Sequence, residues 1–193
     1  SELNWNEKGV TVKQTTDFPE EEQTKLEITK GQASLDLKLR YPSWAKEKGF
    51  SITVNGKPVE VNAEKGSYVS ISRNWKEGDV VLVQFPMKDT TIAMPNVPEY
   101  QAFMHGPILL GAKTGTQDLS GLIAGDSRWG QYPSGKFLPV DQAPILIIED
   151  LSVLANQLEP VANKPLHFTL DTRVLNSDKT LELEPFANIH DAR

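Results

Sequence analysis

The chain has 193 residues, of which 38% are hydrophobic and 24% are charged, a balance typical of a globular protein with a hydrophobic core. Its formal net charge of -6 disfavours nucleic acid and anionic membranes as partners, and no apolar run approaches the roughly 20 residues that span a bilayer. Because the chain contains no cysteine, disulfides, thiolate nucleophiles and cysteine-held metal ions are excluded.

Alternating apolar and polar residues predict short β-strands throughout the first half of the chain. Two of these strands, over 25–30 and 33–40, are expected to be joined as a hairpin by Gly31 and Gln32. Asn55-Gly56 is a strong hairpin signal, because both positions of that turn need a positive φ. Turn residues recur about every ten positions, a spacing that favours a β-sandwich. The remaining strands are expected over 9–16, 50–54, 57–61, 68–72 and 81–85, with a turn over 74–79.

The break from Pro95 to Pro98 marks an expected boundary between two domains. Residues 1–98 are predicted to form a β-sandwich domain, and residues 99–193 a second β-rich domain. The fold class is therefore all-β, with two antiparallel β-sandwich units and one short helix. In the second domain we expect a long loop over 114–139, a buried strand over 145–148 and a short helix over 150–159 with Asp150 as its N-cap, besides strands at 101–104, 108–112, 166–170 and 181–183.

The histidines show no metal-binding or catalytic motif. His105, His167 and His190 are scattered, and no pair has the i, i+4 spacing of a metal-binding helix. A structural role is therefore favoured for each. We predict no metal ligands and no cofactor.

A glycosidase needs two carboxylates roughly 5 to 9.5 Å apart. Sequence spacing cannot place two acids face to face, and surface acids are common, so no catalytic residue is predicted. The acids considered for such a pair are Asp126, Asp141, Glu149 and Asp150.

One loop segment combines side chains that suit a sugar ligand. Trp129 and Tyr132 can stack on the apolar face of a sugar, while Asp126 and Arg128 can bind its hydroxyl groups. The alternative is that the two aromatic side chains fix the loop onto the sandwich. Trp44 and Trp75, which lie beside predicted strands, are expected to be core or corner anchors.

Several stretches resemble glycoside hydrolase family 127, the β-L-arabinofuranosidase-like proteins. The segment Leu39–Ala45 is similar to the family's "LRIPSWA", Val54–Gly56 to its "VNG" and Tyr68–Asp79 to its "YVxIxRxWKxGD". Phe85–Met87 is similar to "LPM", and Pro185–Arg193 to "PFxxIHDSRY".

His105–Leu110 resembles the family's "RGPLVY", with His105 in place of the usual arginine. The resemblance implies that this chain is the C-terminal β-sandwich region of such a protein. It also implies an upstream (α/α)₆ barrel, absent here, that carries a cysteine nucleophile, a carboxylate acid/base and a zinc ion.

The first functional hypothesis is therefore a non-catalytic scaffold of a glycoside hydrolase acting on arabinose-containing or related polysaccharides. It predicts an exposed apolar patch where the barrel docks. The alternative is a carbohydrate-binding module that presents loop aromatics to polysaccharide, and an independent hydrolase is the third possibility. The expected partners are the parent's own barrel and carbohydrate, not nucleic acid or membrane. The resemblance also implies a periplasmic or extracellular location for the parent protein.

Overall fold

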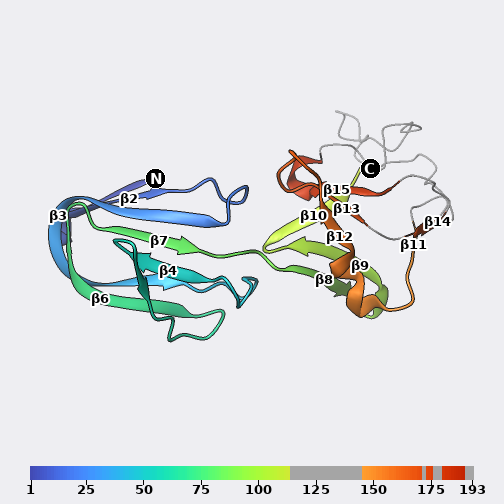
Figure 1. Cartoon of the computed structure of the whole chain (residues 1–193), viewed down its shortest axis with the longest axis horizontal. Coiled ribbons are helices and arrows are strands. Elements are labelled where there is room, and N and C mark those ends of the chain that lie inside the picture. The colour runs from blue at the N-terminus through green and yellow to red at the C-terminus, as the bar shows by residue number, and fades with distance from the viewer. Residues whose placement is uncertain (114–144, 171–172, 176–179, 190–193) are drawn as a thin grey trace, which may run out of the picture. The chain divides into compact units, whose positions relative to one another are not determined.

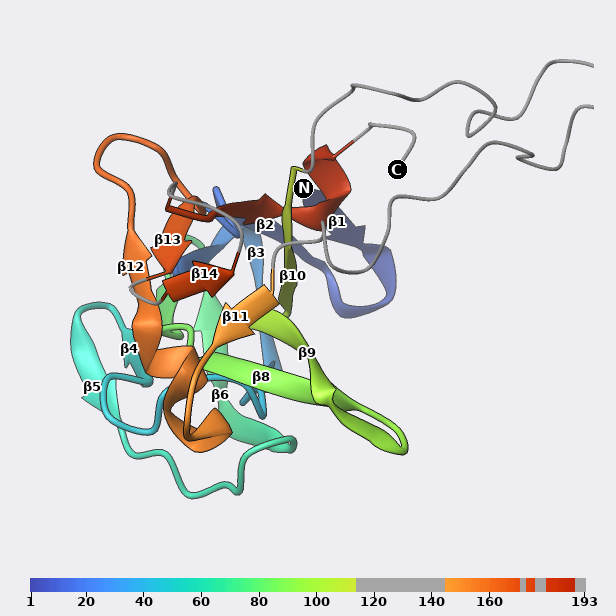
Figure 2. The same ribbon diagram turned by 90° about the vertical axis from the view of Figure 1, so that its right-hand side faces the viewer.

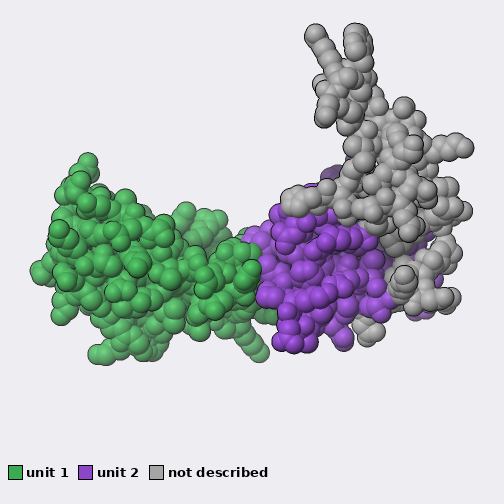
Figure 3. All heavy atoms as spheres, turned by 90° about the horizontal axis from the view of Figure 1, so that it is seen from above, with its two compact units in different colours: residues 1–88 green, residues 89–193 purple. Residues whose placement is uncertain are grey.

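The computed structural model describes residues 1–113, 145–170, 173–175 and 180–189. The chain divides into two compact units, Ser1–Lys88 and Asp89–Arg193, which are coloured separately in Figure 3. This division comes ten residues before the boundary expected at residue 98. Pro95 and Asn96 form the turn between two paired strands rather than a linker, and Asn96 has the positive φ that such a turn requires.

Unit 1 contains seven antiparallel strands in the order β1-β2-β3-β7-β4-β5, with β6 paired to β3 outside that order (Figure 1). Each strand pairs through a ladder of backbone hydrogen bonds, and apolar residues of β3, β4, β6 and β7 alternate toward one core. The elements are β1 Glu2–Trp5, the 3₁₀-helix η1 Asn6–Lys8, β2 Val10–Thr15, β3 Gln23–Arg40, β4 Ser51–Val54, β5 Lys57–Val59, β6 Tyr68–Lys76 and β7 Val80–Gln84.

The continuous strand β3 shows that the hairpin expected at Gly31 and Gln32 is wrong. The first half of β3 pairs with β2 and β7, whereas Gln32–Arg40 pairs with β6. Gly31 has a φ of +83°, and a Cβ added there would meet the carbonyl oxygen of Gly9. The glycine therefore bends a strand at the residue where it changes partners, and Figure 1 shows this curve.

The core of unit 1 surrounds Trp75, which is fully buried. This tryptophan lies inside β6 and not in the turn expected over 74–79, because the strand continues to Lys76. Its indole N–H donates to the carbonyl oxygen of Leu35 at 3.1 Å. The Asn55-Gly56 turn is confirmed, with φ values of 52° and 74°. The other buried members of the core are Ile28, Leu39, Tyr41, Ala45, Phe50, Ile52, Val54, Val69, Val81 and Val83.

Unit 2 is built on a six-stranded antiparallel sheet in the order β12-β13-β15-β10-β9-β8, beside a two-stranded ribbon of β11 and β14. The all-β antiparallel fold class expected from the sequence is therefore confirmed. The elements are β8 Asp89–Met94, β9 Val97–His105, β10 Ile108–Ala112, β11 Ile145–Ile147, the 3₁₀-helix η3 Leu151–Gln157, β12 Leu158–Pro160, β13 Phe168–Leu170, β14 Arg173–Leu175, β15 Glu182–Pro185 and the 3₁₀-helix η4 Phe186–Asn188.

The expected helix over 150–159 is a shorter 3₁₀-helix, η3, that lies beside β8 (Figure 2). Asp150 is its N-cap, as expected, and accepts a hydrogen bond from the Ser152 N–H at 2.8 Å. Leu154 of η3 is buried in the core of unit 2, but Leu158 already belongs to a strand.

The described part of unit 2 forms its buried core on one face of the six-stranded sheet. Its buried members from the sheet include Phe103, Leu110, Phe168 and Leu183, which the strand registers place on one face. The buried strand expected over 145–148 is only half buried, because Leu146 and Ile148 pack against this core while Ile145 and Ile147 are exposed.

Candidate functional site

The loop residues predicted to bind sugar, Asp126, Arg128, Trp129 and Tyr132, lie outside the described residues, so their role stays a prediction. Of the acids considered for a glycosidase pair, Asp126 and Asp141 also lie outside the described part of the chain. Glu149 is exposed, and Asp150 caps η3.

Two of the three histidines have structural contacts within unit 2. The Nδ1 atom of His105 lies 2.6 Å from Oδ1 of Asp89, and its ring packs on Phe168 with 4.8 Å between ring centroids. His167 donates from Nδ1 to the carbonyl oxygen of Pro165 at 2.9 Å, and its Nε2 lies 3.3 Å from Glu184. These contacts agree with the structural roles expected for both side chains, while His190 lies outside the described residues.

The described tryptophans anchor the fold. Trp44 stacks on Phe18 with 5.9 Å between ring centroids and meets Phe85 edge to face at 5.8 Å. Trp75 fills the core of unit 1, where Arg73 lies over its ring at 5.0 Å. Neither tryptophan therefore presents a free face to a sugar, and the expectation that both act as anchors agrees with this packing.

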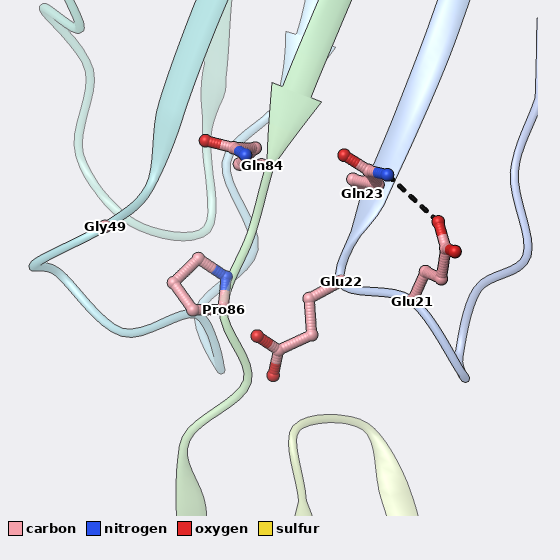
Figure 4. A pocket seen from close by; sticks show the side chains of 6 residues that line it. All are labelled: Glu21, Glu22, Gln23, Gly49, Gln84 and Pro86. Carbon is pink, nitrogen blue, oxygen red and sulfur yellow. Dashed lines mark hydrogen bonds between the residues drawn. The ribbon is translucent and has the colours of Figure 1, made fainter. Parts of the chain in front are cut away.

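Unit 1 has an open pocket of about 440 Å³ at one end of its sheet (Figure 4). The side chains in it have partners within the protein: Glu21 accepts from Gln23 Nε2 at 2.9 Å, and Glu22 accepts from the Met87 N–H at 2.7 Å. Gln84 accepts from the Ser51 hydroxyl at 3.0 Å. No aromatic residue lines the pocket, whose other lining residues are Gly49 and Pro86. It therefore lacks the stacking surface of a sugar site.

The buried carboxylate of Asp79 joins two turns of unit 1. It accepts hydrogen bonds from Asn55 Nδ2 at 2.8 Å and from the Lys76 N–H at 3.0 Å, and Arg73 lies 3.5 Å away. Burial raises the pKa of Asp79, but these hydrogen bonds, together with the positive charges of Arg73 and Lys76, outweigh burial and hold its pKa below the ordinary value of 3.8. A carboxylate kept ionised and fully bonded in this way stabilises turns and is unavailable as an acid catalyst.

The most distinctive surface is the outer face of the six-stranded sheet in unit 2, the face opposite its core. Its apolar half consists of the residues that alternate with the core positions along β8, β9 and β10, together with the first residue of η4. The strand registers place Met104 between Thr90 and Leu109, and Ile92 opposite Ala102. The apolar half comprises Ile92, Ala102, Met104, Leu109 and Phe186. Met94 and Tyr100 are also exposed and lie beside the irregularity that shifts the register between Ala93 and Met94.

The other half of the outer face is charged. Glu184 lies opposite Gly111 in the register and forms an ion pair with Lys113 at 2.7 Å, and its second carboxylate oxygen lies 3.3 Å from Nε2 of His167. Glu182 pairs with Lys164 at 2.8 Å, and this contact chiefly lowers the pKa of Glu182. The sheet therefore presents an apolar area bordered on one side by ionic pairs. Sequence reasoning missed this surface because it predicted no strand over Asp89–Met94, although Thr90, Ile92 and Met94 alternate there.

The described residues contain no group of three or more His, Cys, Asp or Glu that could hold a metal ion. Within the same described ranges, no helix is long and apolar enough to cross a membrane.

Two protein families match the chain, one over each unit. Residues 1–87 match the family described as "Beta-L-arabinofuranosidase, GH127 middle domain". Residues 90–193 match DUF4986, described as a domain of unknown function. The gap between the two matches falls at the division between the structural units. No curated protein matches the chain.

Solved structures similar to the chain include glycoside hydrolases. A GH127 β-arabinofuranosidase is 26% identical with a TM-score of 0.60 over 96% of this chain and 30% of its own length. A GH127 β-L-arabinofuranosidase from Geobacillus stearothermophilus T6 is 20% identical with a TM-score of 0.57, over 96% of this chain and 29% of its own. A further glycoside hydrolase is 20% identical with a TM-score of 0.56, over 95% and 31%. The chain thus spans about a third of the length of these proteins, and the two at 20% identity show the fold alone.

Proposed function

This chain belongs to the DUF4986 family over residues 90–193 and is a β-sandwich region like that of glycoside hydrolase family 127, and on this premise we propose that it is a non-catalytic scaffold. The parent protein would be a glycoside hydrolase acting on arabinose-containing or related polysaccharides. Its catalytic residues would belong to polypeptide outside this chain, and the scaffold would pack against that polypeptide.

The observation that supports this proposal most strongly is the coverage of the solved relatives. The chain aligns with 30% of the GH127 β-arabinofuranosidase, so 70% of that protein lies outside the match. The chain contains no cysteine, so it cannot supply the cysteine nucleophile that the family resemblance implies. Acids in the described part of the chain serve a helix cap, a pair of turns and an ion pair, as Asp150, Asp79 and Glu184 illustrate.

A direct test is hydrolysis of a nitrophenyl arabinofuranoside by the purified chain. We expect no release of nitrophenol above the rate in buffer. Release that scales with protein concentration and survives repeated purification would contradict the scaffold role and favour an independent hydrolase.

The carbohydrate-binding alternative is tested by titrating the chain with arabinose-containing oligosaccharides while following tryptophan fluorescence. The scaffold proposal predicts no saturable change. A saturable change that is lost in Trp129→Ala and kept in Trp5→Ala, a control in a partly exposed tryptophan of unit 1, would establish the binding module instead.

A periplasmic or extracellular location of the parent is part of the same proposal, because polysaccharide substrates lie outside the cell. Cell fractionation followed by immunodetection of residues 1–193 tests it. Recovery of the parent protein with cytoplasmic markers alone would contradict it.

A further inference from the structure

We propose that the apolar half of the outer face in unit 2 is the surface on which this region docks onto the remaining polypeptide of its parent protein. This inference rests on the proposed function and adds to it a specific surface. The residues at its centre are Ile92, Met104, Leu109 and Phe186.

The strand registers make these residues neighbours. Met104 on β9 lies between Thr90 on β8 and Leu109 on β10. Phe186 lies over Gly111, because a Cβ added to that glycine would come within 3.3 Å of the Phe186 ring and 2.8 Å of Ile189. Gly111 follows Leu109 by two residues and so faces the same side of the sheet. The glycine lets η4 fold down onto the sheet and brings its phenylalanine beside Leu109.

The core formed by the described residues of unit 2 does not include this apolar area. That core is on the opposite face, where Leu110, Phe168 and Leu183 are buried beneath Leu154 of η3. Leu109 and Ile92 remain 39% and 57% exposed in the chain as described. A contiguous exposed apolar face beyond what the core requires is typical of a surface that binds another protein.

The kinds of side chain on this face indicate a protein partner rather than a sugar. Ile92, Met104 and Leu109 are aliphatic or thioether side chains, which contribute area and adaptability but not the flat aromatic face that sugars stack on. The two aromatic residues, Tyr100 and Phe186, come from different elements, the strand β9 and the 3₁₀-helix η4.

The charged half of the outer face gives the area a polar border. Lys113 pairs with Glu184 and Lys164 pairs with Glu182, so these charges compensate one another within the unit, and His167 also contacts Glu184. An apolar centre beside a polar edge is the usual anatomy of a protein interface. A partner covering the apolar half would leave these ion pairs in place at its edge.

The remaining polypeptide of the parent is the occupant that the comparisons favour. The face lies in the unit that matches DUF4986, and in each of the solved relatives about 70% of the chain lies outside the region that matches. That polypeptide is covalently linked, so it meets the face at a high effective concentration. A second copy of this chain or a polysaccharide is the competing occupant.

The test measures binding of residues 1–193 to the polypeptide encoded directly upstream of Ser1 in the same reading frame, by calorimetry. Leu109→Lys is matched by Leu151→Lys, since the two leucines are 39% and 40% exposed and only the first lies on the outer face. Ile92→Lys is matched by Leu3→Lys, where both side chains are 57% exposed and Leu3 lies in unit 1. We expect Kd to rise at least about tenfold in Leu109→Lys and Ile92→Lys and less than about twofold in the controls.

Circular dichroism and thermal melting verify that each variant folds. If Leu109→Lys and Ile92→Lys both fold and both leave Kd unchanged, the inference is overturned while the scaffold role stays intact. A dimer of the wild-type chain in sedimentation equilibrium that Leu109→Lys abolishes, with upstream binding unchanged, would assign the face to a second copy. Failure of the wild-type chain to bind the upstream polypeptide at all, together with saturable oligosaccharide binding, would refute the proposed function itself.

Discussion

The two units differ in how they use their apolar side chains. Unit 1 surrounds its core with the bent strand β3, and among the described residues only Leu3, Trp5 and Tyr68 are its large exposed hydrophobic side chains. Unit 2 has nine such residues in its described part, and several of them share one face of its sheet. Among the described residues, unit 2 therefore exposes more large hydrophobic side chains than unit 1, which is the surface expected if unit 2 carries the proposed docking face.

The difference in cores gives the largest expected effect. Trp75→Ala removes the fully buried indole at the centre of unit 1 together with its hydrogen bond to Leu35. We expect the free energy of unfolding of unit 1 to fall by about 3–5 kcal/mol. Residue-resolved hydrogen exchange should show lost protection at Val81 and Ile52, with protection at Leu110 retained.

Trp5→Ala serves as the control for Trp75→Ala, because Trp5 is partly exposed, and its cost should stay within about 0.5–1 kcal/mol. An equal loss of hydrogen-exchange protection in the cores of unit 1 and unit 2 would show that the two units unfold as one. In that case the two units would not differ in stability.

Asp79→Ala is expected to have the next largest effect, because it leaves the Asn55 amide and the Lys76 N–H of unit 1 without their acceptor. The cost should be about 2–3 kcal/mol in urea denaturation at pH 7. Asp36→Ala, at an exposed position on β3, is the control and should be close to neutral.

The same carboxylate sets a pH dependence for unit 1. The folded-state pKa of Asp79 is lowered from 3.8, so its contribution to stability is complete above that value and is lost as the pH falls through the lower folded-state pKa. The wild-type chain should therefore lose unfolding free energy in unit 1 below about pH 4, and Asp79→Asn should lose less over that window. Parallel pH profiles for the two proteins would assign the acid sensitivity to other groups.

Gly31→Ala should destabilise unit 1 by about 2 kcal/mol, from the positive φ and from the contact of the new Cβ with the Gly9 carbonyl. Gly66→Ala isolates the effect of the positive φ, because Gly66 has the same φ of +83° and nothing within 4 Å of an added Cβ, so the difference between the two variants measures the contact with Gly9. Thermal melting should show a smaller loss in Gly66→Ala. Equal losses would mean that strand β3 accommodates the bend without a close approach to Gly9.

Gly31 also illustrates how far the sequence could predict this fold. Alternation identified the strands on both sides of it, but a glycine between two alternating runs is compatible with a turn or with a bend. Only the pairing of Gln32–Arg40 with the distant strand β6, from Gln32 opposite Lys76 to Arg40 opposite Tyr68, selects the bend. Local pattern thus predicted the strands, while their connection depended on contacts distant in sequence.

The outer face of unit 2 was harder to predict for a related reason. Met104 and Leu109 are apolar like their neighbours Phe103 and Leu110, so β9 and β10 look apolar on both faces. Which face becomes the core is decided by η3 and the β11 ribbon, whose Leu154 and Leu146 cover only one of them. By contrast, the Asn55-Gly56 turn and the Asp150 cap depend on the geometry of a few adjacent residues, and both were predicted.

The smallest effect is expected at that cap in unit 2. Hydrogen bonds from the Ser152 hydroxyl and N–H lower the pKa of Asp150, so its contribution is present above the ordinary value of 3.8 and lost at more acidic pH. Asp150→Ala should lower the melting temperature of unit 2 slightly, by less than Asp79→Ala lowers that of unit 1, because Asp150 is exposed to solvent.

Asp150→Asn separates the two contributions of this side chain. Asparagine is as good an N-cap as aspartate, so this variant should melt like the wild-type chain at pH 7 and lack its acid dependence. A loss equal to that of the alanine variant would mean that the carboxylate charge, and not the geometry of the cap, stabilises η3. In that case added salt should weaken the contribution in unit 2, whereas the buried hydrogen bonds of Asp79 in unit 1 should be insensitive to salt.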